Sequence, residues 1–168
     1  MGSVIFLLRV ALGALLIVAG VLKAHDGPAV TASTVAGFRL LPPSLNALLG
    51  LFLPYFEIGL GLYLGAGLFT RGAGFIAAAQ FAIFAAAVGS LVVRHIPANC
   101  GCFGAGANTP PSWGHVAVDL LLALAALAIA LRPPGRFAVD NVLARRNAFE
   151  AEHGTSQVAA IGDTQHES

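Results

Sequence analysis

The chain has 168 residues, of which 57% are hydrophobic and only 10% are charged. Soluble domains carry about 25% charged residues, so a chain with a mean hydropathy of +0.82 has too little polar surface for a water-soluble particle. The composition therefore predicts an integral membrane protein with one membrane domain. The net charge of +1 comes from nine basic and eight acidic residues spread along the chain, which excludes the basic stripe of a nucleic-acid-binding protein.

Four segments are apolar over roughly 20 residues, the length a helix needs to cross the hydrocarbon core of a bilayer. They are Ser3–Leu22, Leu45–Phe69, Gly72–Val93 and Gly114–Leu131. The first lacks the basic start of a secretory signal peptide, and Lys23 follows it where a cleavage site would need small residues. We therefore predict that the first segment is retained and that the protein has four spans.

The remaining segments are more polar. Residues 28–41 have loosely spaced apolar side chains, which indicates a short helix lying in the membrane interface. Residues 151–168 have the composition of a disordered segment. The predicted fold is all-α: an integral membrane four-helix bundle over residues 1–131 with a short interfacial helix, followed by a flexible, partly disordered polar tail over residues 132–168.

The basic residues predict the orientation in the membrane, because Lys and Arg are retained preferentially in cytoplasmic segments. Four spans place both termini and the 70–71 turn on one side, and the loops 23–44 and 94–113 on the other. Five basic residues fall on the side of the termini and three on the opposite side (Arg71, Arg132, Arg136, Arg145 and Arg146 against Lys23, Arg39 and Arg94). We therefore predict a multi-pass protein of the inner or plasma membrane with cytoplasmic termini and an extracytoplasmic 94–113 loop.

The two cysteines, Cys100 and Cys102, are separated by a single glycine in a Gly- and Pro-rich loop after the third span. A disulfide between them closes a tight ring, which departs from relaxed geometry and is therefore readily reduced. This lability suits electron exchange, so both are candidate catalytic residues. The alternative is a static bridge, or two small buried side chains, bracing the loop. Only His95 and His115 lie near the thiols in sequence, and we predict no metal site.

Arg9, Lys23, Glu57 and Asp119 are the candidate charges inside the membrane, where an unpaired charge is costly. Glu57 and Arg9 have nearly matching depths if their helices cross in opposite directions, which predicts an Arg9–Glu57 ion pair. Asp119 and Lys23 lie toward the opposite face of the membrane and are expected to pair with each other. Each pair is either a structural strut or a functional group: a proton-handling or ligand-binding site at Glu57, or a carboxylate that tunes a thiol at Asp119.

Three motifs together resemble the MauE family of methylamine-utilisation membrane proteins and their DoxX-like relatives. They are AGVLK at the end of the first span, LPYFEIGLG in the second and CGCFG before the fourth (Ala19–Lys23, Leu53–Gly61 and Cys100–Gly104), and Trp113 and Asp119 fit the same pattern. The resemblance covers roughly residues 1–131. It implies a four-helix membrane bundle associated with extracytoplasmic thiol–disulfide chemistry. In the family's type role, such a protein assists maturation of the disulfide-rich small subunit of methylamine dehydrogenase, alongside a thioredoxin-like partner.

The sequence is therefore compatible with three functions. The first is a membrane component that exchanges thiols and disulfides with an exported, disulfide-containing substrate and a thioredoxin-like protein; as an enzyme it would be a thiol–disulfide oxidoreductase. A membrane quinone is then a candidate cofactor, by analogy with quinone-using four-helix oxidoreductases. The second is a non-catalytic membrane chaperone or scaffold. The third is a small carrier that uses Glu57 inside the bundle.

Overall fold

The computed structural model of the protein describes residues 2–98 and 110–131. Within these residues the chain is helical and contains no strand, in the order α1 (Gly2–Asp26), α2 (Pro28–Gly37), α3 (Pro43–Ala66), α4 (Thr70–Val93) and α5 (Trp113–Leu131). The helices α1, α3, α4 and α5 are long and apolar enough to cross a membrane, which confirms the four predicted spans. Cys100, Cys102 and the predicted tail lie outside the described residues.

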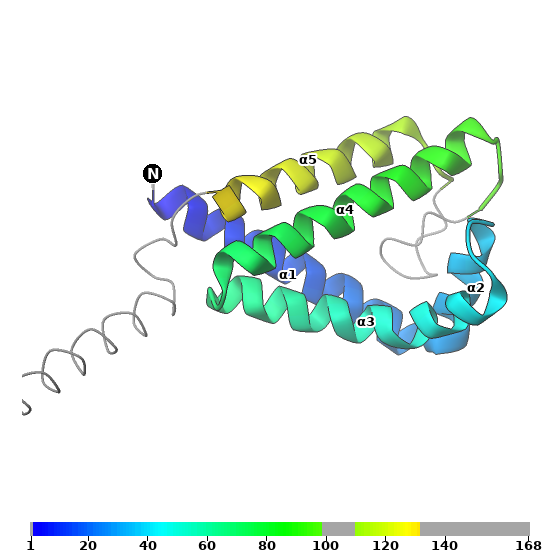
Figure 1. The fold of residues 1–168 in the computed structure, drawn as a ribbon, viewed down its shortest axis with the longest axis horizontal. Helices are drawn as coiled ribbons and strands as arrows, with labels where there is room; N and C mark the ends of the chain where they lie inside the picture. Colours follow the sequence, from blue (N-terminus) through cyan, green and yellow to red (C-terminus); the bar gives the residue numbers. More distant parts are fainter. Residues whose placement is uncertain (1, 99–109, 132–168) are drawn as a thin grey trace, which may run out of the picture.

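The spans form two closely packed pairs, α1 with α3 and α4 with α5. In Figure 1, α3 and α4 meet at the turn that joins them and diverge toward the opposite end of the bundle, where α2 lies against α3. The N-terminus lies at the end away from α2. Because the spans alternate in direction, the end of α1, the start of α3, the end of α4 and the start of α5 share the end that carries α2. We call this the α2 end.

Glycines let the backbones of α1 and α3 approach closely. A Cβ atom on Gly13 would lie 2.7 Å from the carbonyl oxygen of Gly61, and a Cβ on Gly61 would lie 2.6 Å from that of Gly13. Two turns further along α1, a Cβ on Gly20 would lie 2.6 Å from the carbonyl oxygen of Pro54. These contacts leave no room for a side chain, so they set the register in which α1 packs on α3.

Small residues serve the same purpose between α4 and α5. A Cβ on Gly74 would lie 3.0 Å from Ala130, so the two helices are in near-backbone contact there. The side chains that this packing buries form one core cluster shared by all four spans. Its members are Leu12, Leu16, Leu60, Leu64, Ala73, Ala77, Phe81, Ala126 and Ile129.

The short helix α2 follows α1 after a turn at Gly27, whose φ of 89° is a conformation that glycine adopts readily. It packs against the first half of α3, where a Cβ on Gly50 would lie 2.5 Å from the carbonyl oxygen of Pro28. The helix ends at Gly37, four residues before the predicted boundary. Arg94, at the end of α4, donates a hydrogen bond of 3.1 Å to the carbonyl oxygen of Phe38, which ties the end of α2 to the end of α4.

Candidate functional site

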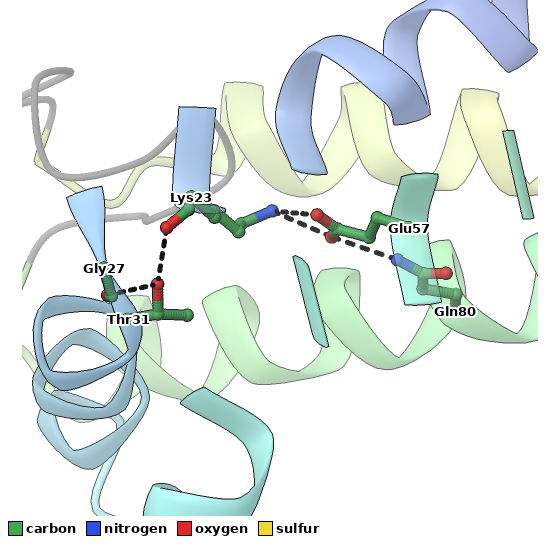
Figure 2. A network of polar contacts seen from close by, with 5 residues as sticks. All are labelled: Lys23, Gly27, Thr31, Glu57 and Gln80. Carbon is green, nitrogen blue, oxygen red and sulfur yellow. Dashed lines mark hydrogen bonds and ion pairs between the residues drawn. The ribbon is translucent and has the colours of Figure 1, made fainter. Parts of the chain in front are cut away.

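A buried polar cluster lies inside the bundle and joins α1, α3 and α4. The ammonium nitrogen of Lys23 lies 2.8 Å from both carboxylate oxygens of Glu57, and Gln80 Nε2 donates a hydrogen bond of 3.1 Å to Glu57 Oε1 (Figure 2). Only 4% of Lys23, 1% of Glu57 and 7% of Gln80 is exposed. A fully ionised carboxylate accepts but does not donate, so three N–H donors facing Glu57 are well matched to a charged side chain.

The glycine contact between α1 and α3, and the contact between α2 and the end of α1, bring these groups together. Gly20 packs against α3 at Pro54 and Ile58, so Glu57 lies nearly level with Gly20. Lys23 is one turn further along α1, and its long side chain reaches back to Glu57. The hydroxyl of Thr31 in α2 lies 3.3 Å from the carbonyl oxygens of Lys23 and Gly27, which holds the end of α1 to α2 (Figure 2).

The predicted Arg9–Glu57 ion pair is wrong, because the partner of Glu57 is Lys23. The prediction used depth in the membrane alone. Gly13 packs opposite Gly61, so Arg9, one turn before Gly13, lies level with the end of α3 instead of with Glu57. Arg9 is 1% exposed, its guanidinium lies beside Gly67, and its Cζ is 5.5 Å from the centre of the Phe6 ring.

Asp119 in α5 lies near the same cluster. It is 6% exposed and interacts electrostatically with His115 and with Lys23. Its Oδ2 atom is buried and accepts no hydrogen bond from the described residues. The expected Asp119–Lys23 pairing is therefore only partly right: the direct ion pair of Lys23 is with Glu57, and Asp119 is a second carboxylate near the same ammonium group.

Sequence reasoning missed Gln80. The span that carries it has no charged residue apart from Arg71 in its first turn, so no charge marks Gln80 as a site residue. A recognisable signal was present, since Gln80 is the single amide side chain in α4. A buried amide in a membrane span needs hydrogen-bond partners, and Glu57 supplies one of them.

A cavity of about 1170 Å³ opens between the two helix pairs on the side of the α2 end. Residues of α2, α3 and α4 line it, and Lys23 and Gln80 lie among its lining residues. Apart from Asp26, Thr31, Thr34 and Ser90, the remaining walls are aliphatic or aromatic side chains. The buried polar cluster therefore lies at one end of a large apolar space.

The cysteines lie outside the described residues, but the chain is described on either side of them. Ala98 lies near α2, where a Cβ on Gly37 would be 3.6 Å from the Ala98 Cβ. On the far side of the loop, Trp113 begins α5 at the same end of the bundle, and Ser112 Oγ lies 2.8 Å from His115 Nδ1. The described residues that flank the loop, Ala98 and Ser112, therefore both lie at the α2 end.

These features define a class: a four-span, all-helical membrane protein with a buried lysine–carboxylate cluster. The family of methylamine utilisation protein MauE matches residues 1–132. The chain is also 36% identical over 132 residues to the methylamine utilization protein MauE of Paracoccus denitrificans, and the aligned region covers 78% of this chain and 70% of that protein. No solved structure matches. The chain belongs to the MauE family, which is tied to methylamine utilisation.

Proposed function

We propose that this MauE-family protein exchanges thiols and disulfides outside the cytoplasm and thereby assists maturation of an exported partner. The observation that carries the proposal is the pair Cys100 and Cys102. They are the only cysteines of the sequence, and a single residue separates them in the segment that links α4 to α5. The small subunit of methylamine dehydrogenase is the partner that the family resemblance suggests, and a thioredoxin-like protein is the suggested redox partner.

The exchange is a pair of thiolate displacements. The thiolate of one cysteine attacks a disulfide sulfur of the partner, forming a mixed disulfide and releasing the partner's other sulfur as a thiolate. The second cysteine then attacks the mixed disulfide, which releases the partner as a dithiol and leaves Cys100 and Cys102 joined. Two electrons pass to the partner, and the reverse sequence oxidises a partner dithiol. The single glycine between the cysteines favours a labile bridge, as such a cycle requires.

We infer that the buried charges have a structural role for the exchange site. Lys23 and Glu57 satisfy each other, with Gln80 as a third partner. This complete pairing favours a structural role for Glu57 over the role of a carrier's binding group. By joining α1, α3 and α4, the cluster holds in place the end of the bundle from which the cysteine loop extends.

The exchange chemistry predicts that both cysteines are required. Cys100→Ser and Cys102→Ser should each abolish maturation of the exported partner in cells, because one attacks and the other resolves the mixed disulfide. One of the two variants should accumulate a covalent adduct that dithiothreitol releases, detected as a shifted band on a non-reducing gel. Ser112→Ala, which alters a hydroxyl of the same loop, is the control and should mature the partner normally. If the double serine variant also supports normal maturation, the protein is a non-catalytic scaffold.

We place the termini in the cytoplasm and the cysteine loop outside it. Lys23 is buried and paired with Glu57, so it is not a loop charge, and the basic residues then stand at five to two in favour of the side of the termini. A membrane-impermeant maleimide applied to intact, mildly reduced cells should label Cys100 or Cys102.

The matched control is a variant with both cysteines changed to serine and Gly72→Cys added. Gly72 is exposed at the opposite end of the bundle, and a Cβ there meets no atom within 4 Å. This variant should be labelled only after permeabilisation. Labelling of the Gly72→Cys variant in intact cells, with Cys100 and Cys102 labelled only after permeabilisation, would show that the topology is the opposite one.

A further inference from the structure

The cavity between the helix pairs plays no part in the proposed thiol exchange, and it is deep. On α4 its lining extends from Ser90, near the α2 end, to Ile76, fourteen residues earlier. This separation corresponds to about 21 Å of helix, whereas one leaflet of the hydrocarbon core is about 15 Å thick. The cavity, of about 1170 Å³, is therefore deep enough for the acyl chains of a lipid.

Two arginines lie at the edge of the cavity that faces the α2 end. Phe38 and Ser90 line this edge, which we call the rim, and Arg94 Nη1 donates a hydrogen bond of 3.1 Å to the Phe38 carbonyl oxygen. Arg39 follows Phe38 directly, so both arginines belong to the corner where the end of α2 approaches the end of α4 (Figure 1). Both are exposed, and neither forms an ion pair with a described residue. The rim therefore carries two cations that no described acidic residue neutralises.

The same two arginines run against the charge distribution of the chain. In the orientation proposed above, Arg39 and Arg94 are the two basic loop residues on the extracytoplasmic side, where Lys and Arg are otherwise less frequent. An anionic group at the rim would offset their charge.

Most polar side chains of the cavity lining are matched within the protein. Lys23 is paired with Glu57, and Gln80 donates to the same carboxylate while its Oε1 is buried. The hydroxyl groups of the lining donate to backbone carbonyl oxygens over distances between 2.7 and 3.3 Å (Thr31, Thr34 and Ser90). These groups therefore do not require a polar ligand.

Asp26 and Tyr55 are the other polar residues of the lining. Asp26 already has an interaction partner, and it lies before the start of α2, whose ten residues separate it from the rim by about 15 Å of helix. Tyr55 forms no hydrogen bond with the described residues, so its hydroxyl is available as a donor. Side chains lean toward the start of their helix, which for α3 is the α2 end. Tyr55 thus offers a ligand a donor on the side of the rim.

We propose that the cavity binds one anionic phospholipid, with its acyl chains between α3 and α4 and its phosphate at Arg39 and Arg94. Guanidinium groups match phosphate oxygens in charge and in hydrogen-bond geometry. The ester oxygens below the phosphate are acceptors, which suits a donor at Tyr55, and the apolar walls pack against the chains. This lipid lies within the bundle, in contrast to the lipid that surrounds the spans. Its binding does not depend on the thiol exchange.

Native mass spectrometry of the purified full-length protein, released from a mild detergent, tests the site. We expect saturable binding of one palmitoyl-oleoyl phosphatidylglycerol per chain. The phosphatidylcholine with the same two chains carries a compensating positive charge, so it should bind about tenfold more weakly. Glycerol 3-phosphate has the phosphate without the chains, and an excess of it should not displace the lipid. The variant with both cysteines changed to serine should bind phosphatidylglycerol as tightly as the unaltered protein, which separates this proposal from the thiol exchange.

Arg39→Gln tests the rim without removing a hydrogen bond or ion pair between described residues. The variant should bind phosphatidylglycerol about fivefold more weakly, because one of the two cations is lost, and should bind phosphatidylcholine nearly as before. Arg71→Gln is the matched control: Arg71 is exposed at the opposite end of the bundle, and its replacement should leave both affinities unchanged.

Two alanines of α4, one helical turn apart, test the cavity. Ala86 lines it, whereas Ala82 is exposed and does not line it. Ala86→Trp occupies space that the acyl chains need and should weaken phosphatidylglycerol binding by about tenfold or more, while Ala82→Trp should leave the Kd unchanged. Equal affinity for the two phospholipids, unaltered binding by Arg39→Gln or by Ala86→Trp, or displacement by glycerol 3-phosphate would each overturn the proposal.

Discussion

Replacing Lys23 by methionine should lower the free energy of unfolding by about 3–5 kcal/mol, because it leaves a buried carboxylate without its cation. Lys23 Nζ lies 2.8 Å from both oxygens of Glu57, and 1% of Glu57 is exposed. Methionine retains most of the apolar stem of lysine, so the loss reports mainly the charge. Asp119 also interacts with Lys23, so the substitution affects two carboxylates at once.

Glu57→Gln should cost less than Lys23→Met. After that change Lys23 still has Asp119 nearby, and a glutamine side chain can accept a hydrogen bond from the ammonium group. The double variant should recover part of the summed losses, because neither of its new side chains is charged. Reversible unfolding by SDS in mixed micelles measures all three free energies. Arg71→Met, at an exposed basic residue, is the control, with an expected change within about 0.5 kcal/mol. Strictly additive single losses would mean that Lys23 and Glu57 do not interact.

Gly61→Ala should destabilise the bundle by about 1–3 kcal/mol, because the new methyl group has no room. A Cβ on Gly61 would lie 2.6 Å from the backbone oxygen of Gly13 and 2.8 Å from Ile17, so α1 and α3 would have to separate. The displacement would also loosen the register that brings Lys23 to Glu57. The effect therefore extends from packing to the buried polar cluster.

Gly59→Ala is the matched control on the same helix. A Cβ on Gly59 meets no atom within 4 Å, so alanine should leave stability unchanged or raise it by up to about 1 kcal/mol through its higher helix propensity. The same SDS titration compares the two variants. Equal effects of Gly61→Ala and Gly59→Ala would show that the close contact between α1 and α3 is not present in the membrane.

The architecture could be predicted from the sequence because it depends on the length of each apolar run. The four spans and the short helix after Pro28 follow from composition alone, and the structure moves their ends by only a few residues. The burial of Glu57 and Asp119 was equally predictable, since each lies within an otherwise apolar span.

The pairing inside the bundle could not be predicted in this way. Depth alone matches Glu57 with Arg9 and places Lys23 toward the opposite face, whereas the observed pairing of Glu57 with Lys23 depends on the register of α1 against α3. Close backbone contacts at Gly13 and Gly61 set that register, and apolar composition does not encode it. The role of Gln80 and the cavity beside it depend on how far the two helix pairs diverge, which is a property of tertiary packing.

The redox state of Cys100 and Cys102 in living cells tests the central claim most directly. Cells are quenched with acid, free thiols are alkylated with a polyethylene-glycol maleimide, and the bands are separated by size. Thiol–disulfide exchange predicts that dithiol and disulfide forms coexist, and that a low dose of dithiothreitol converts the pair to the dithiol while a relaxed structural disulfide in another exported protein stays intact. A pair that stays fully reduced, or fully oxidised at doses that reduce the structural disulfide, would contradict it.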